Sequence, residues 1–63
     1  MINNLKKFRE KANYTQEKFA QKLDVTNDYI SMIERGRRTP SFKLAKMIAD
    51  ELNKTVDEVF FDN

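Results

Sequence analysis

The fold is decided by residues 16–35, which read QEKFAQKLDVTNDYISMIER. The apolar residues of this stretch stand at its fourth, eighth, tenth, fifteenth and eighteenth places, which are Phe19, Leu23, Val25, Ile30 and Ile33. Spacings of three and four within each half are typical of amphipathic helices, so the pattern predicts two short helices joined by a turn. The fifth place holds Ala20, whose small side chain lets the two helices cross at close range.

The polar residues of the same stretch predict where these helices begin and end. Thr15 is the expected N-cap of a helix over 16–23, and Thr26 that of a helix running to about Arg35. Asp24 stands at the ninth place, often a glycine in this arrangement, and aspartate tolerates the left-handed backbone better than most residues. The spacing is that of a helix-turn-helix, whose second helix lies in the major groove of DNA.

A further helix is expected before this stretch, over about residues 4–13. Asn3 or Asn4 is its expected N-cap. Its inward stripe is predicted to consist of Leu5, Phe8 and Ala12.

Two more helices are expected after it. Gly36 suits the left-handed position that ends the second helix of the pair, and Ser41 caps a helix to about residue 52. The inward residues of that helix are predicted to be Leu44, Ala45, Ile48, Ala49 and Leu52. Thr55 and Glu58 form a T-x-x-E capping box for a last short helix with Val56, Val59 and Phe60. Because no segment alternates as a strand does, we predict an all-α fold of five short helices.

Several runs of the sequence resemble one family closely. TQE at 15–17, AQKL at 20–23, YISMIERG at 29–36 and Pro40 are similar to the phage-repressor (Xre/Cro-type) helix-turn-helix family. The resemblance continues through 48–52 and 59–60, so it covers essentially the whole chain. It implies a single DNA-binding domain over 1–63 that acts as a dimeric transcriptional regulator. The regulator is expected to be a repressor, as in the family that it resembles.

The resemblance also implies which residues meet double-stranded DNA. Base contacts are expected from the start of the second helix, at Asn27, Asp28, Tyr29, Ser31 and Met32. Asn27 can pair with adenine. Asp28 either accepts from cytosine N4 or only adds favourable charge to the first turn, and both readings stay open.

Phosphate contacts are expected around that helix, at Gln16, Thr26, Arg35, Arg37, Arg38 and Lys43. Gln16 is also expected to brace the recognition helix. No acid interrupts the arginines at 35, 37 and 38, which favours phosphate contacts over a merely solvated loop.

Three other residues are assigned to structure and assembly. The resemblance implies a partly buried ion pair between Arg9 and Glu34. Phe61 is expected to be exposed near the C-terminus, with Met1 and Ile2 nearby, and to form a homodimer contact.

Composition excludes several other functions. The chain has no cysteine and no histidine, which removes disulfides, thiolate or imidazole metal sites and histidine acid–base chemistry. We expect no enzyme activity, no metal, no cofactor and no small-molecule effector. No run is long enough to span a bilayer and no signal peptide follows Met1, so we expect a cytoplasmic protein with no membrane partner.

The net charge of +2 hides alternating blocks. Residues 1–23 and 35–46 are basic, whereas 24–34 and 47–63 are acidic. The basic blocks are either a solvated surface or a site for an anionic partner. An antitoxin-like or other protein-interaction module on the same scaffold is the alternative to a DNA-binding regulator.

Overall fold

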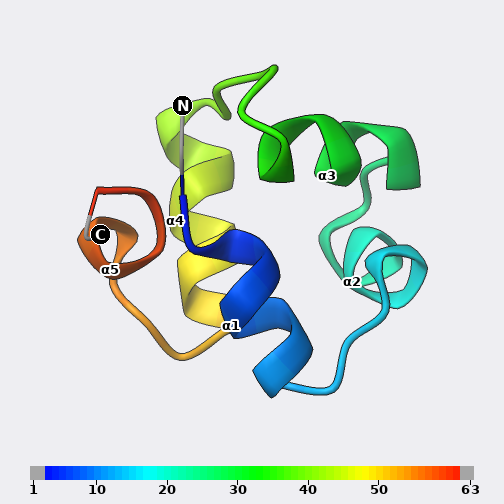
Figure 1. The fold of residues 1–63 in the computed structure, drawn as a ribbon, viewed down its shortest axis with the longest axis horizontal. Coiled ribbons are helices and arrows are strands. Elements are labelled where there is room, and N and C mark those ends of the chain that lie inside the picture. The colour runs from blue at the N-terminus through cyan, green and yellow to red at the C-terminus, as the bar shows by residue number, and fades with distance from the viewer. Residues whose placement is uncertain (1–2, 62–63) are drawn as a thin grey trace.

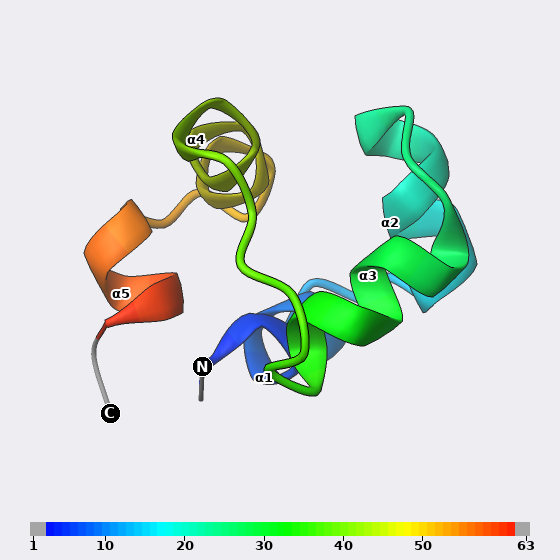
Figure 2. The same cartoon turned by 90° about the horizontal axis from the view of Figure 1, so that it is seen from above.

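The computed structural model describes residues 3–61, and within them the chain forms five helices and no strand. These are α1 (Leu5–Lys11), α2 (Gln16–Leu23), α3 (Asn27–Glu34), α4 (Phe42–Glu51) and α5 (Val56–Phe60). In Figure 1, α2 and α3 form one side of the molecule and α4 and α5 the other, with α1 between them. Figure 2 shows the same division from above. The all-α, five-helix prediction is confirmed.

Hydroxyl side chains begin four of the five helices. Thr15, Thr26, Ser41 and Thr55 each accept a hydrogen bond from the backbone N–H three residues ahead. Glu58 completes the capping box by accepting from the backbone N–H of Thr55 at 2.9 Å. A lost N-cap of this kind costs a helix about 1 kcal/mol, so these residues fix the helix starts.

The start of α1 is held by two asparagines with different roles. Asn3 Oδ1 accepts from the backbone N–H of Leu5 at 3.0 Å, as a cap does. Asn4 instead reaches α5, where its Nδ2 donates to Glu58 O at 3.0 Å and its backbone N–H to Val59 O at 2.7 Å. The two ends of the described chain are therefore bonded together.

A left-handed residue follows each of the first four helices. These residues are Asn13 (φ 65°), Asp24 (φ 59°), Gly36 (φ 75°) and Asn53 (φ 59°). Asparagine and aspartate are the non-glycine residues that tolerate this conformation best, which explains how a chain with one glycine makes four such junctions.

The core takes residues from all five helices. Leu5, Phe19, Ile30, Ile33, Ile48 and Val59 are fully buried. Each such side chain contributes on the order of 1.5–3 kcal/mol through burial. The inward prediction for Ala12 is wrong, because α1 ends at Lys11 and leaves Ala12 exposed. Tyr14, two residues later, packs against the core with its ring edge-on to Phe19 at a centroid distance of 5.2 Å.

Within residues 3–61, no helix combines the length and the apolar character that crossing a membrane requires.

Candidate nucleic-acid interface

The turn between α2 and α3 has the geometry that its sequence predicts. Asp24 adopts the left-handed conformation, and the next backbone N–H, of Val25, donates to Ala20 O at 3.0 Å. Ala20 is buried, and Thr26 Oγ1 then caps α3 through Tyr29 N–H at 3.1 Å. These local bonds set the angle at which α3 leaves the turn.

A buried polar cluster holds the far end of α3. Arg9 Nε of α1 donates to Glu34 Oε2 at 2.6 Å, and both side chains are almost completely buried. Gln16 Nε2 of α2 donates to Glu34 Oε1 at 2.9 Å. Arg9 Nη1 also donates to Tyr14 O at 2.6 Å. Glu34 thus ties the last residue of α3 to α1 and α2, and Gln16 braces the helix directly.

The five candidate base-reading residues differ in accessibility. Asn27 and Asp28 are exposed on the first turn of α3. Tyr29, Ser31 and Met32 are half-buried, and Tyr29 packs against the core. The first turn of α3 is therefore the part of the helix whose polar side chains, those of Asn27 and Asp28, are accessible to a ligand.

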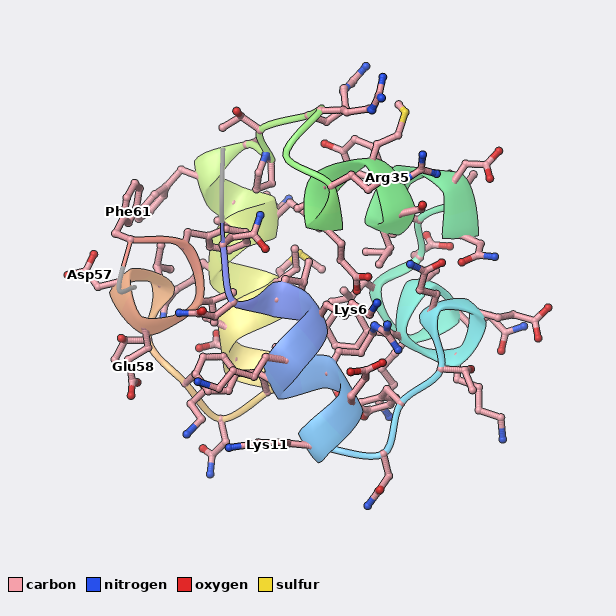
Figure 3. All side chains as sticks on the ribbon, in the orientation of Figure 1. Lys6, Lys11, Arg35, Asp57, Glu58 and Phe61 are labelled. Carbon is pink, nitrogen blue, oxygen red and sulfur yellow. The ribbon has the colours of Figure 1, made fainter. Side chains whose placement is uncertain are left out.

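The arginine segment after α3 is anchored by its backbone while its side chains stay exposed. Gly36 N–H donates to Ile33 O at 3.0 Å, and Arg37 N–H donates to Met32 O at 2.9 Å. Arg35 donates from Nη2 to Ser31 Oγ at 3.0 Å, and Figure 3 shows Arg35 beside α3. Arg38 stacks on Tyr29, with its Cζ 5.3 Å from the ring centroid. The side chains of two of the three arginines, Arg35 and Arg38, therefore contact residues of α3.

The other residues expected to contact phosphates lie before and after this segment in the sequence. Thr26 is exposed where it caps α3, and Lys43 is exposed in the first turn of α4. Gln16 is half-buried, and its bond to Glu34 uses one of its two amide hydrogens.

Two acidic residues lie far from the arginine segment. Asp57 and Glu58 stand on α5, across the molecule from Arg35 in Figure 3. Within residues 3–61, no three acidic side chains gather closely enough to hold a metal ion. The arginine segment therefore lies across the molecule from these two carboxylates of α5, whereas α3 itself carries exposed Asp28 in its first turn and follows exposed Asp24.

Two apolar residues are strongly exposed, one directly after α5 and one at the start of α4. Phe61 follows α5 and is 68% exposed, as its sequence position predicts, whereas Met1, Ile2 and Asp62 lie outside the described residues. Phe42, the first residue of α4, is 78% exposed and was not predicted from the sequence. Helical spacing gives no signal for this exposure, because Phe42 stands three residues before Ala45 and seven before Ala49, which is the spacing of an inward face.

Comparisons with known proteins identify the fold. The helix-turn-helix family matches residues 5–59. An HTH-type transcriptional regulator from Archaeoglobus fulgidus is 38% identical over 95% of this chain and 84% of its own. The control protein C.MunI of a Mycoplasma species is 41% identical over 95% of this chain and 82% of its own.

A solved structure gives the same result. The crystal structure of the clp gene regulator ClgR from Corynebacterium glutamicum matches with a TM-score of 0.77 and 31% identity. The match covers 82% of this chain and 55% of that one. The expected phage-repressor (Xre/Cro-type) resemblance is confirmed, and the family consists of DNA-binding regulators and not of enzymes. The chain belongs to the helix-turn-helix family of transcriptional regulators.

Proposed function

We propose that this regulator binds double-stranded DNA sequence-specifically, in the cytoplasm, and represses transcription as a homodimer on a pseudo-palindromic operator. One observation carries the proposal: the first turn of α3 exposes Asn27 and Asp28, and three exposed arginines, at 35, 37 and 38, follow the same helix. An exposed recognition helix flanked by cations is the arrangement that major-groove binding requires.

Base reading is assigned to α3. Asn27 offers an amide that pairs with both N6 and N7 of adenine, and Asp28 offers a carboxylate to cytosine N4. The half-buried residues Tyr29, Ser31 and Met32 lie on the same helix, and Met32 suits apolar contact with a thymine methyl. The charge of Asp28 also interacts favourably with the positive N-terminal end of α3, so this carboxylate stabilises the helix as well.

Affinity is assigned to the surrounding cations and polar groups. Arg35, Arg37 and Arg38 meet phosphates on one side of α3, with Gln16, Thr26 and Lys43 as further phosphate contacts. Such contacts fix the register of the protein on the duplex and carry no sequence information themselves.

The homodimer is assigned to the C-terminal surface around Phe61. Its exposed ring supports an apolar contact between two copies. Twofold symmetry of the protein matches twofold symmetry of the operator, with half-sites about 10 bp apart. The repressor role rests on the resemblance to phage repressors.

Selection of bound duplexes from a random pool, followed by salt titration of the winners, tests the proposal. We expect an inverted repeat and an affinity that falls linearly with salt on logarithmic axes. A pool that yields no consensus would contradict sequence-specific binding. Stable co-purification of a second polypeptide, with no DNA bound, would instead favour the protein-interaction module.

A further inference from the structure

Tyr29 has a contact that a base-reading residue does not need. The guanidinium of Arg38 lies over its ring, 5.3 Å from the centroid. The same ring packs against the core, and the backbone N–H of Tyr29 is bonded to Thr26 Oγ1 at 3.1 Å. Tyr29 is therefore held in place from the core side and covered by a cation on the other.

Arg38 is fixed at both of its ends. Its backbone N–H donates to Met32 O at 3.3 Å, beside the 2.9 Å bond from Arg37 N–H to the same oxygen. Its guanidinium rests on the Tyr29 ring. A cation–π contact uses the charge of the guanidinium and occupies no hydrogen-bond acceptor, and a guanidinium carries five N–H donors that can donate to a phosphate oxygen.

We propose that Tyr29 is a platform that positions Arg38 for a phosphate, and that its hydroxyl does not read a base. The inference rests on the proposed DNA binding and assigns Tyr29 a different part in it. A free arginine loses side-chain freedom when it binds a phosphate, whereas a stacked arginine has already lost much of it. The ring should therefore raise the affinity of the protein for every DNA sequence by a similar factor.

Arg37 provides a matched comparison. It neighbours Arg38 in the same exposed segment, but within residues 3–61 no aromatic ring lies beneath its guanidinium. A change at Tyr29 should therefore act through Arg38 and not through Arg37.

Two substitutions separate a platform from a base reader. Tyr29→Phe keeps the ring and should leave affinity and sequence preference unchanged within about twofold. Tyr29→Leu removes the ring and should weaken binding to operator and non-operator duplexes alike by about two- to fivefold, the effect of one exposed cation–π contact. Loss of preference at one base pair in Tyr29→Phe would overturn the proposal.

A double-mutant cycle tests the link to Arg38. Tyr29→Leu should have no further effect in an Arg38→Ala background and its full effect in an Arg37→Ala background. Equal effects in both backgrounds would show that Tyr29 acts independently of Arg38 and would overturn the proposal.

A measurement without DNA distinguishes failure of this inference from failure of the proposed function. In the free protein, the Arg38 side-chain protons should show an upfield ring-current shift by NMR, retained in Tyr29→Phe. Absence of that shift in the unchanged chain overturns the platform, even where DNA binds and even where Tyr29→Leu does not fold. A wild-type chain that shows the shift but binds no duplex contradicts the proposed function, and with it the role of the stack in phosphate binding.

Discussion

Arg9 Nε lies 2.6 Å from Glu34 Oε2, in an ion pair whose side chains are only 7% and 4% exposed. The pair joins α1 to the last residue of α3, and Gln16 adds a bond from α2 to the same carboxylate. A buried pair of this kind contributes little beyond a well-packed apolar pair, but the loss of one partner is costly. Its value here is that it fixes the end of the recognition helix relative to two other helices.

Replacing Arg9 by leucine should therefore destabilise the fold strongly. The change leaves Glu34 buried with Gln16 as its remaining side-chain partner, and such an uncompensated charge costs about 3–5 kcal/mol. Urea unfolding measures the loss. Lys11→Leu, at an exposed position of the same helix, is the control and should change stability by about 0.5 kcal/mol or less. Equal stability of Arg9→Leu and the control would contradict the structural role of the pair.

The sequence is sufficient to predict features that depend on neighbours along the chain. Helix starts follow from Thr15, Thr26, Ser41 and Thr55 because a cap bonds only three residues ahead. The left-handed conformation of Asp24 was also predictable locally, because it stands at a place of the helix-turn-helix that is often glycine and aspartate tolerates this conformation.

Contacts between distant segments were not predictable in this way. The bond from Asn4 to Glu58 O joins residues 54 apart in the sequence, and no local pattern marks it. The stack of Arg38 on Tyr29 depends on the path of the loop after Gly36, which the backbone bonds to Met32 determine. Of the long-range contacts at the candidate site, the bonds of Gln16 and Arg9 to Glu34 were expected from the family resemblance, whereas the contact of Arg38 with Tyr29 was not.

Tyr14 makes the stability sensitive to alkaline pH. Its hydroxyl donates to Glu51 Oε2 at 2.5 Å. This hydrogen bond, with smaller effects of burial and of the Glu51 charge, raises the pKa of Tyr14 above its ordinary value of 10.0. Because the folded state favours the neutral phenol, the stabilisation is complete below pH 10.0 and is lost as pH rises through the folded-state pKa.

Tyr14→Phe should accordingly be less stable than the wild type at neutral pH, and the difference should shrink above pH 10.0. Urea unfolding from pH 7 to about 11.5 measures it. Glu51→Gln, which keeps an acceptor but removes the charge, should show a smaller alkaline loss than the wild type. A difference between Tyr14→Phe and wild type that stays constant across this range would contradict the link.

Arg37 and Asn27 should affect DNA binding in different ways. Arg37→Ala should weaken binding to all duplexes and reduce the logarithmic salt slope by about 1, because one phosphate contact is lost. Asn27→Ala should relax the preference at one base pair, where discrimination is worth about 1–3 kcal/mol. Titration against a set of single-base operator variants at several salt concentrations measures both effects.

A matched control comes from α1. Lys11 lies at the end of that helix, away from Arg35 in Figure 3, so Lys11→Ala should change the salt slope less than Arg37→Ala does. If Asn27→Ala weakens all duplexes equally, its role in reading a base is wrong.

The exposed ring of Phe61 should decide the oligomeric state. Phe61→Asp places a charge at the proposed twofold contact and should give a monomer by sedimentation at tens of micromolar, whereas Phe61→Leu should stay a dimer because it keeps an apolar side chain. The monomer should lose about 10² or more in affinity for the full inverted repeat, since two linked half-site contacts become independent, but should retain its affinity for one half-site. Unchanged binding to a single half-site shows that α3 is intact. A wild-type chain that is monomeric under the same conditions would remove Phe61 from the assembly, and the inverted repeat would then require a different explanation.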